Sequence, residues 1–214
     1  MKISEHGVVL GTTQSGKTTK TLELMKSIGK KSLKIFVNTK REAKWLPYFK
    51  YKIETPEHMV DVYENYPEFT PFFLLIEPDV TDRGAADKIA EIFDICLKFH
   101  QDFPMKFNTY IFIDEIHVFQ SKFTRNESFA RIFSMGLGLG LIGIAISQRA
   151  SSIHNDILKN CGFLLLAHQD LGDLKYLREN GIIPYNSLDK IVFKGKYDMY
   201  IRENMRSKLK KVKV

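Results

Sequence analysis

Short apolar runs alternate along the chain with longer segments of helical periodicity. The runs predicted as strands are GVVL at 7–10, KIFVN at 34–38, FFLLIE at 72–77, TYIFIDE at 109–115, LIGIAIS at 141–147 and FLLLA at 163–167. Amphipathic segments between them predict helices at 17–28, 56–65, 84–101, 127–135, 154–161 and 170–180. Alternation of this kind predicts an α/β fold with a mainly parallel sheet flanked by helices on both faces.

Two segments depart from this alternation. Residues 39–52, which include Pro47, are less regular and are expected to form no strand. The segment IVFKGKYDMYI at 191–201 has two short alternating runs around Lys-Gly-Lys, which predicts a C-terminal antiparallel hairpin. We therefore expect one domain at 1–202, followed by a basic C-terminal tail at 203–214.

The composition is that of an ordinary globular protein. Hydrophobic residues make up 44% and charged residues 27% of the 214 residues, enough for one sizeable core. Cys96 and Cys161 both lie in apolar segments, which predicts two buried thiols in a reducing compartment. No apolar run approaches the ~18 residues of a membrane-spanning helix, so we expect no transmembrane segment and a cytosolic location.

The chain is basic, and its positive charge is unevenly distributed. The formal net charge is +7, with basic residues concentrated at 26–44 and 202–213. Such charge favours a polyanionic partner, because each neutralised phosphate releases counterions. A solvated lysine-rich surface and a frayed tail would also explain it.

The segment GTTQSGKT at 11–18 matches the phosphate-binding pattern GxxxxGK[ST] and lies between a predicted strand and helix, as this motif requires. Its glycines permit a tight backbone path whose N–H groups face a phosphate. Lys17 is predicted to reach the β/γ-oxygens and Thr18 to bind Mg²⁺. The predicted nucleotide-binding residues are Gly11, Thr12, Thr13, Gln14, Ser15, Gly16, Lys17, Thr18 and Thr19.

Two acidic residues end the strand TYIFIDE. Asp114 is predicted to hold Mg²⁺ through water, and Glu115 to act as the general base that polarises the attacking water. An acid pair favours hydrolysis over phosphoryl transfer, although the two could instead cap the following helix. The sequence contains neither NKxD, typical of GTP sites, nor LSGGQ, so ATP is the expected nucleotide.

The strand LIGIAIS ends in Ser147-Gln148-Arg149. An amide at this position can hydrogen-bond both the attacking water and a phosphate oxygen, so Gln148 is a candidate γ-phosphate sensor. Gln148 could also merely terminate the strand.

Together, GTTQSGKT, IDEIH and AISQRASSIHNDILKNCGFLLL resemble the FtsK/HerA superfamily of ring-shaped DNA-pumping ATPases. The resemblance covers residues 6–180 and is strongest to genome-packaging ATPases of tailless double-stranded DNA viruses with internal membranes. It implies an ATPase that uses ATP and Mg²⁺ to translocate double-stranded DNA without sequence preference. It also implies a hexameric or pentameric homo-oligomeric ring, capsid or membrane proteins of the virion as partners, and a location in the host cytoplasm or with the virion.

The resemblance further implies an arginine finger supplied by a neighbouring subunit, often from the turn before the Gln-bearing strand. Here that segment reads SMGLGLGL and contains no arginine, so Arg131, Arg149 and Arg125 are the candidates. A second departure is FVNTK after the second strand, where relatives often carry an acidic residue. DNA contacts are expected from one of two basic groups, either Lys122 and Arg125 or Lys40, Arg41 and Lys44.

Other functions stay open. A filamentous-phage-assembly or conjugation-type ATPase would use the same motifs. A small-molecule kinase would need an arginine-bearing lid, for which the sequence shows no clear candidate. A nucleotide-dependent scaffold would bind ATP without needing to hydrolyse it.

Overall fold

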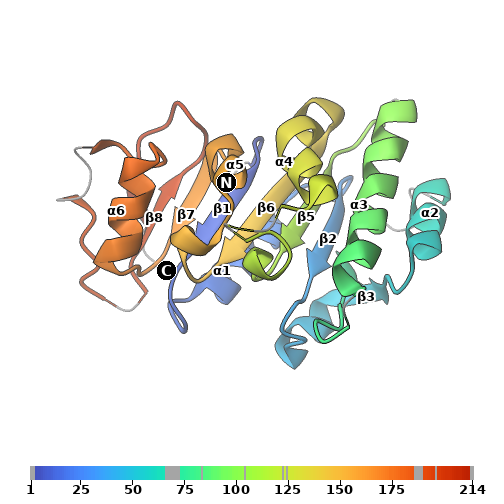
Figure 1. Ribbon diagram of the computed structural model, residues 1–214, viewed down its shortest axis with the longest axis horizontal. Helices are drawn as coiled ribbons and strands as arrows, with labels where there is room; N and C mark the ends of the chain where they lie inside the picture. The colour runs from blue at the N-terminus through green and yellow to red at the C-terminus, as the bar shows by residue number, and fades with distance from the viewer. Residues whose placement is uncertain are drawn as a thin grey trace.

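The computed structural model describes residues 3–65, 73–82, 84–103, 105–121, 123, 125–185, 190–195 and 197–212. Over these residues the chain forms a nine-stranded sheet in the order β3-β4-β2-β5-β6-β1-β7-β8-β9 (Figure 1). All six predicted strands are present, and they pair in parallel. They are β1 Gly7–Leu10, β2 Leu33–Val37, β4 Phe73–Ile76, β5 Thr109–Ile113, β6 Leu141–Ser147 and β7 Phe163–Leu166.

The helices cover both faces of the sheet unequally. The α-helices are α1 Lys17–Ser27, α2 Pro56–Glu64, α3 Ala85–Asp102, α4 Glu127–Leu139, α5 Asn155–Asn160 and α6 Leu171–Glu179. Helices α2 to α6 pack on one face, and α1 packs on the other, where Leu24 and Met25 join a separate buried cluster (Figure 1). Side chains alternate across each strand, so Val8 and Leu10 of β1 face one layer while Val9 faces the other. The predicted α/β architecture is confirmed.

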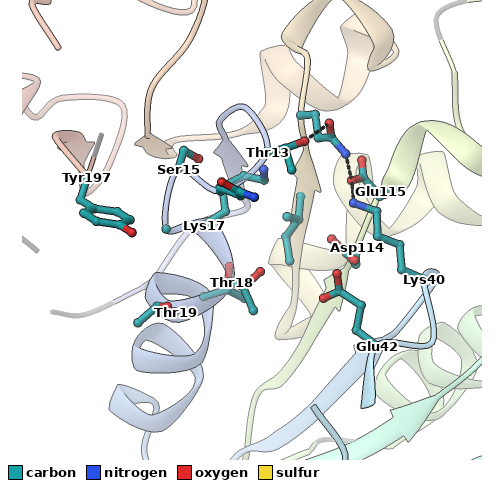
Figure 2. Close-up of a pocket in the computed structure, with 15 residues that line it drawn as sticks. Thr13, Ser15, Lys17, Thr18, Thr19, Lys40, Glu42, Asp114, Glu115 and Tyr197 are labelled. Atoms are coloured by element: carbon teal, nitrogen blue, oxygen red, sulfur yellow. Dashed lines mark hydrogen bonds and ion pairs between the residues drawn. The ribbon is translucent and has the colours of Figure 1, made fainter. Parts of the chain in front are cut away.

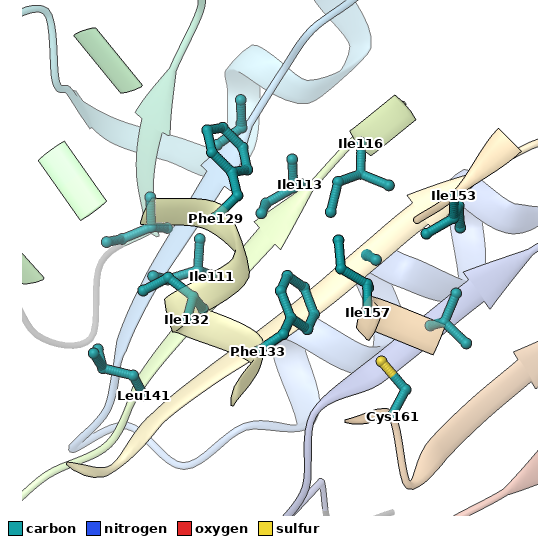
Figure 3. Packing of buried hydrophobic residues seen from close by; sticks show 14 of the residues in the cluster. Ile111, Ile113, Ile116, Phe129, Ile132, Phe133, Leu141, Ile153, Ile157 and Cys161 are labelled. Atoms are coloured by element: carbon teal, nitrogen blue, oxygen red, sulfur yellow. The ribbon is translucent and has the colours of Figure 1, made fainter. Parts of the chain in front are cut away.

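Helix α4 lies unusually close to β6. A Cβ atom added to Gly143 of β6 would lie 2.8 Å from Cζ of Phe133 on α4, so the absence of a side chain permits this approach. Phe133 and Ile132 pack there with Ile111 and Ile157 (Figure 3). This contact holds α4 against the middle of the sheet, immediately beside the strands that carry the candidate site.

Helix α4 also extends further than predicted. The segment SMGLGLGL continues the helix to Leu139 instead of forming a turn. Gly140 then ends it with φ 85°, and its N–H donates to the carbonyls of Gly136 and Leu137. A glycine in the left-handed conformation is a frequent helix stop, whereas the earlier glycines of this segment are compatible with helix at a modest cost.

The two irregular segments differ from the sequence predictions. Residues 43–48 form a 3₁₀ helix, and Phe49–Lys52 form β3, an edge strand parallel to β4 that was not predicted. Three of its four residues are exposed, so the strand lacks the apolar pattern by which the inner strands were recognised.

A C-terminal antiparallel hairpin is present, as predicted, but its strands are not the two runs predicted at 191–201. The second half of that segment forms β8, Met199–Arg202, which pairs antiparallel with β7 and with β9, Lys210–Val212. The first half forms no strand over Ile191–Phe193, and the Tyr200 hydroxyl accepts the backbone N–H of Val192 there. Asp198 accepts the N–H groups of Lys194 and Gly195. Lys196 lies outside the described residues. The hairpin partner β9 falls within the segment predicted to be a basic tail.

Both cysteines are buried and unpaired, as predicted. Within the described part of the chain, no helix combines the length and apolar character needed to cross a bilayer.

Candidate nucleotide-binding and hydrolysis site

The loop between β1 and α1 has the backbone path expected of a phosphate-binding loop. Gly16 adopts φ 86° at the start of α1, and a Cβ on Gly11 would lie 2.5 Å from Oγ of Ser15 and 2.6 Å from Cβ of Ala167. Neither position therefore accepts a side chain without a backbone shift. The N–H of Thr12 donates to the carbonyl of His168 at 2.8 Å, which ties the loop to the segment after β7.

Lys17 is positioned inside this loop. Its Nζ donates to the carbonyl oxygens of Gly11 and Thr12, the second at 3.0 Å. Burial lowers the pKa of Lys17, an effect that the nearby Glu115 and Asp114 carboxylates oppose. The ammonium group therefore lies within the loop that the motif assigns to phosphate binding, and its contact with phosphate oxygens stays a prediction.

A cavity of about 460 Å³ opens beside the loop (Figure 2). This volume lies within the range of small-molecule binding sites. The predicted residues that line the cavity are Thr13, Gln14, Ser15, Gly16, Lys17, Thr18, Thr19, Asp114, Glu115 and Gln148. Gly11 and Thr12 are not among the lining residues, but their carbonyl oxygens accept from Lys17. In the sequence, the acid pair follows the loop by about 100 residues, and Gln148 follows the acid pair by about 30. The structure brings all three together at the cavity.

The order of the strands explains this convergence. Strands β5, β6 and β1 are adjacent and parallel, with Ile113 opposite Ala145 and Leu10 opposite Ser147. The residues that follow these strands must therefore emerge at the same edge of the sheet. Asp114, Gln148 and the phosphate loop are those residues.

The two carboxylates occupy different environments. Burial, followed by the charge of Glu115, raises the pKa of Asp114 to about 6. Burial would likewise raise the pKa of Glu115, but hydrogen bonds from Lys40 and Gln148 outweigh it and lower that pKa. Glu115 therefore stays ionised at neutral pH, as a general base must be before it accepts a proton.

The Glu115 side chain is held by two neighbouring side chains through its Oε1 atom. Its Oε1 atom contacts Nζ of Lys40 and accepts from Nε2 of Gln148 at 2.7 Å, and its Oε2 atom lies 3.4 Å from Nδ1 of His117. Its backbone has φ 45°, a left-handed conformation that is uncommon outside glycine. Strained residues of this kind concentrate at functional sites, so the geometry is consistent with the predicted role of Glu115.

Gln148 connects the phosphate loop to Glu115. Oγ1 of Thr13 donates to Oε1 of Gln148 at 2.9 Å, while Nε2 of Gln148 donates to Glu115. A single amide therefore contacts both the loop that would hold the phosphates and the carboxylate that would activate water. This placement suits a γ-phosphate sensor, a role that stays a prediction.

Mg²⁺ fits the oxygen donors at this site. The residues that would hold it are Thr18, through its hydroxyl, and Asp114, a buried carboxylate whose raised pKa a nearby cation would lower. Among the described residues, no group of three His, Cys, Asp or Glu side chains could hold a metal ion. A site with few protein ligands is typical of Mg²⁺, which usually keeps several waters and shares substrate phosphates.

Five cavity residues were not predicted as part of the site: Thr21, Lys40, Glu42, Ile146 and Tyr197. Lys40 was expected to be a DNA contact, but its ammonium group lies against Glu115. Glu42 brings an acidic side chain to the segment after β2, four residues beyond Asn38, where FVNTK lacks one. These two could have been found by considering every polar residue just after a central strand. Tyr197 had no such signal, because it comes from the segment before β8.

The candidate arginines lie outside the cavity. Arg131 on α4 pairs with Asp94 on α3 at 3.3 Å, and Arg125 pairs with Glu127 and Asp156. Arg149 is exposed, directly after Gln148. Of the other basic residues considered for DNA, Arg41 donates to the carbonyl of Pro78 at 3.0 Å, while Lys122 and the Lys44 side chain lie outside the described residues.

Comparisons with known proteins find similarity in the fold alone. No protein-family model matches the sequence, and a search of curated proteins finds no significant match. The genome packaging NTPase B204 from Sulfolobus turreted icosahedral virus 2, in complex with ATP-gammaS, superposes with a TM-score of 0.74 at 14% identity. That match covers 100% of this chain and 98% of B204.

Two other solved structures are longer than this chain. The pCW3 conjugation coupling protein TcpA gives a TM-score of 0.62 at 14% identity, with 99% of this chain and 60% of TcpA covered. EssC from Geobacillus thermodenitrificans gives 0.60 at 12% identity, with 96% of this chain and 38% of EssC covered. The resemblance predicted from the motifs is therefore confirmed at the level of the fold, which this chain shares with a viral genome-packaging NTPase, with the conjugation coupling protein TcpA and with ATPases 2 and 3 of EssC.

Proposed function

We propose that this protein is an ATP-hydrolysing motor that translocates double-stranded DNA and packages a viral genome into a preformed capsid. The observation that carries this proposal is the fold match to B204, which spans 100% of this chain and 98% of B204. The matches to TcpA and EssC cover much smaller parts of those proteins. The acid pair beside the phosphate loop supports hydrolysis in particular.

In this proposal, each of the cavity side chains has a separate role in ATP hydrolysis. Lys17 binds the β/γ-phosphate oxygens, and Glu115 accepts a proton from the attacking water. Gln148 orients that water, and its contact with Thr13 reports on the phosphate end of the loop. Thr18, through its hydroxyl, and Asp114, through water, would hold Mg²⁺, which would neutralise charge on the phosphates.

Two further elements belong to the proposal. The net charge of +7 favours contacts with DNA phosphates, which are independent of sequence and weaken steeply with salt. A homo-oligomeric ring would place an arginine of one subunit at the site of its neighbour, and Arg149 is well placed because it directly follows Gln148 and is exposed. Capsid or membrane proteins of the virion would be the packaging partners, in the host cytoplasm.

The motor proposal predicts DNA-dependent ATP hydrolysis. The purified chain should hydrolyse ATP faster with long double-stranded DNA than without it, and added salt should reduce this stimulation because DNA binding releases counterions. Steady-state phosphate release measures the rates, and the mass in solution with and without a non-hydrolysable ATP analogue measures assembly. A Lys17→Ala variant serves as the inactive control.

The motor proposal would be contradicted if DNA does not change the rate of ATP hydrolysis and the protein is a monomer in every nucleotide state. The runner-up is a conjugation-type ATPase, for which the fold match to TcpA is the supporting observation. Co-purification of the chain with capsid proteins would favour packaging over this alternative.

A further inference from the structure

The cavity beside the phosphate loop extends beyond the groups that the phosphates require. At one end lie Asp114, Glu115 and Gln148. Tyr197 lines the cavity on the other side of the loop, with Lys17 and Thr18 between the two ends (Figure 2). The cavity therefore has a direction, from a carboxylate-rich end to an aromatic end.

This direction sets the orientation of a bound nucleoside triphosphate. The γ-phosphate must lie next to the general base, so it belongs at the Glu115 end. The β-phosphate belongs in the cradle of the loop, at the N-terminus of α1. The sugar and base must then leave the loop on the side away from Glu115, which is the side where Tyr197 lies.

Tyr197 presents an aromatic surface at that place. Its side chain is 54% exposed, although it lines the cavity. A Cβ added to Gly16 would lie 3.3 Å from Cδ1 of Tyr197 and 3.0 Å from Cε of Met199, so both side chains pack directly against the end of the phosphate loop. An aromatic ring in this position offers a base a stacking surface that is open to solvent before the nucleotide binds.

The position of Tyr197 is set by the folded C-terminal segment. Oδ2 of Asp198 accepts the N–H groups of Lys194 at 2.7 Å and Gly195 at 3.1 Å, and it pairs with Nζ of Lys211 on β9 at 2.6 Å. Met199 then begins β8, which pairs with β7 and β9. The turn that carries Tyr197 is therefore attached to the sheet, so little ordering is needed when a ligand binds.

We propose that Tyr197 stacks on the purine base of the nucleotide whose phosphates the loop at 11–18 binds. The inference rests on the proposed ATPase function and deepens it, because it assigns the base-binding end of the site to the C-terminal segment. A stacking contact reads the π-face of a base and not its hydrogen-bonding edge, so Tyr197 strengthens binding without selecting strongly between purines.

The test separates base binding from phosphate binding. Calorimetry measures the dissociation constants of a non-hydrolysable ATP analogue and of inorganic tripolyphosphate, both with Mg²⁺, for the full chain and its Tyr197→Ala variant. Tyr197→Ala should weaken binding of the ATP analogue about tenfold, the usual size of one base–aromatic stack, and leave binding of tripolyphosphate unchanged.

Two further variants serve as controls. Tyr197→Phe keeps the ring and should bind the ATP analogue as the wild type does. Tyr185→Ala removes another exposed tyrosine, 79% exposed and outside the residues found to line the cavity, and should also leave binding unchanged. Retained tripolyphosphate binding shows that each variant is folded at the loop.

Equal weakening of both ligands by Tyr197→Ala would overturn the inference, because the tyrosine would then only shape the phosphate loop. Unchanged binding of both would overturn it as well. A wild type that binds neither ligand would overturn both the inference and the ATPase. If the wild type binds the nucleotide but DNA does not change its rate of ATP hydrolysis, only the motor proposal is contradicted. The effect of Tyr197→Ala on binding would still support the stacking contact.

Discussion

At the scale of the residue, Glu115 is the most constrained side chain of the site. It is 3% exposed, has a left-handed backbone and contacts both Lys40 and Gln148. The Lys40 contact also means that a cation already balances the Glu115 charge in this structure. Water can be activated only if Glu115 keeps its negative charge, so this side chain is the one whose chemistry most directly tests hydrolysis.

A Glu115→Gln substitution is expected to lower ATP turnover about 100-fold or more, because the amide keeps the shape but cannot accept the proton. Binding of a non-hydrolysable ATP analogue should be retained, since Lys17 and the loop are unchanged. Phosphate release and calorimetry measure the two effects. Glu179→Gln, on an exposed position of α6, is the matched control.

Full turnover in the Glu115→Gln variant would show that another group activates water. If turnover is lost but biological activity persists, the protein is a nucleotide-dependent scaffold and not a motor.

At the scale of the element, two glycines that are close in the sequence differ in the space available for a side chain. Gly138 lies within helix α4 with no neighbouring atom within 4 Å of an added Cβ. Gly143 lies in β6, where an added Cβ would meet the Phe133 ring of α4. The same chemical change should therefore affect stability in opposite directions.

Gly138→Ala should raise the free energy of unfolding by about 0.5–1 kcal/mol, because alanine favours helix. Gly143→Ala should lower it by about 1–3 kcal/mol, because the extra methyl group overpacks the contact between α4 and β6. Urea denaturation of each variant measures both values. Destabilisation by Gly138→Ala would indicate that the end of α4 is not helical in solution.

The elements also show where prediction from sequence succeeds. Strand β6 has the predicted bounds, Leu141–Ser147, because it is buried on both faces and reads as a continuous apolar run. Strand β3 was missed because an edge strand with exposed side chains lacks this run. The hairpin was misplaced because the alternating pattern at 191–193 does not show that a side-chain group, the Tyr200 hydroxyl, takes the backbone N–H of Val192.

At the scale of the whole molecule, the site lies at one edge of the sheet, where a neighbouring subunit could complete it. Arg149 emerges at this edge, whereas Arg131 points into an ion pair with Asp94 between α4 and α3. An arginine that acts on a neighbouring subunit must be able to reach across an interface, which favours Arg149.

Mixing of variants tests this arrangement. Arg149→Ala and Lys17→Ala should each be inactive alone, but their mixture should regain part of the ATP turnover. In mixed rings a Lys17→Ala subunit supplies Arg149 to the intact loop of its Arg149→Ala neighbour. The comparison is a mixture of Arg131→Ala and Lys17→Ala. If this mixture regains ATP turnover and the Arg149→Ala mixture does not, the arginine finger is Arg131. If Arg149→Ala and Arg131→Ala are each fully active alone, neither arginine is the finger.

The central strands, the phosphate loop and the acid pair could all be predicted from the sequence. These features are local, since a buried parallel strand is a continuous apolar run and a phosphate loop needs its glycines at set spacings. Adjacent parallel strands then bring Asp114, Glu115 and Gln148 to the loop. Which other side chains join them depends on tertiary packing. Lys40 and Tyr197 enter the cavity because loops and a strand far apart in the sequence pack at the same edge, and no local pattern encodes that packing.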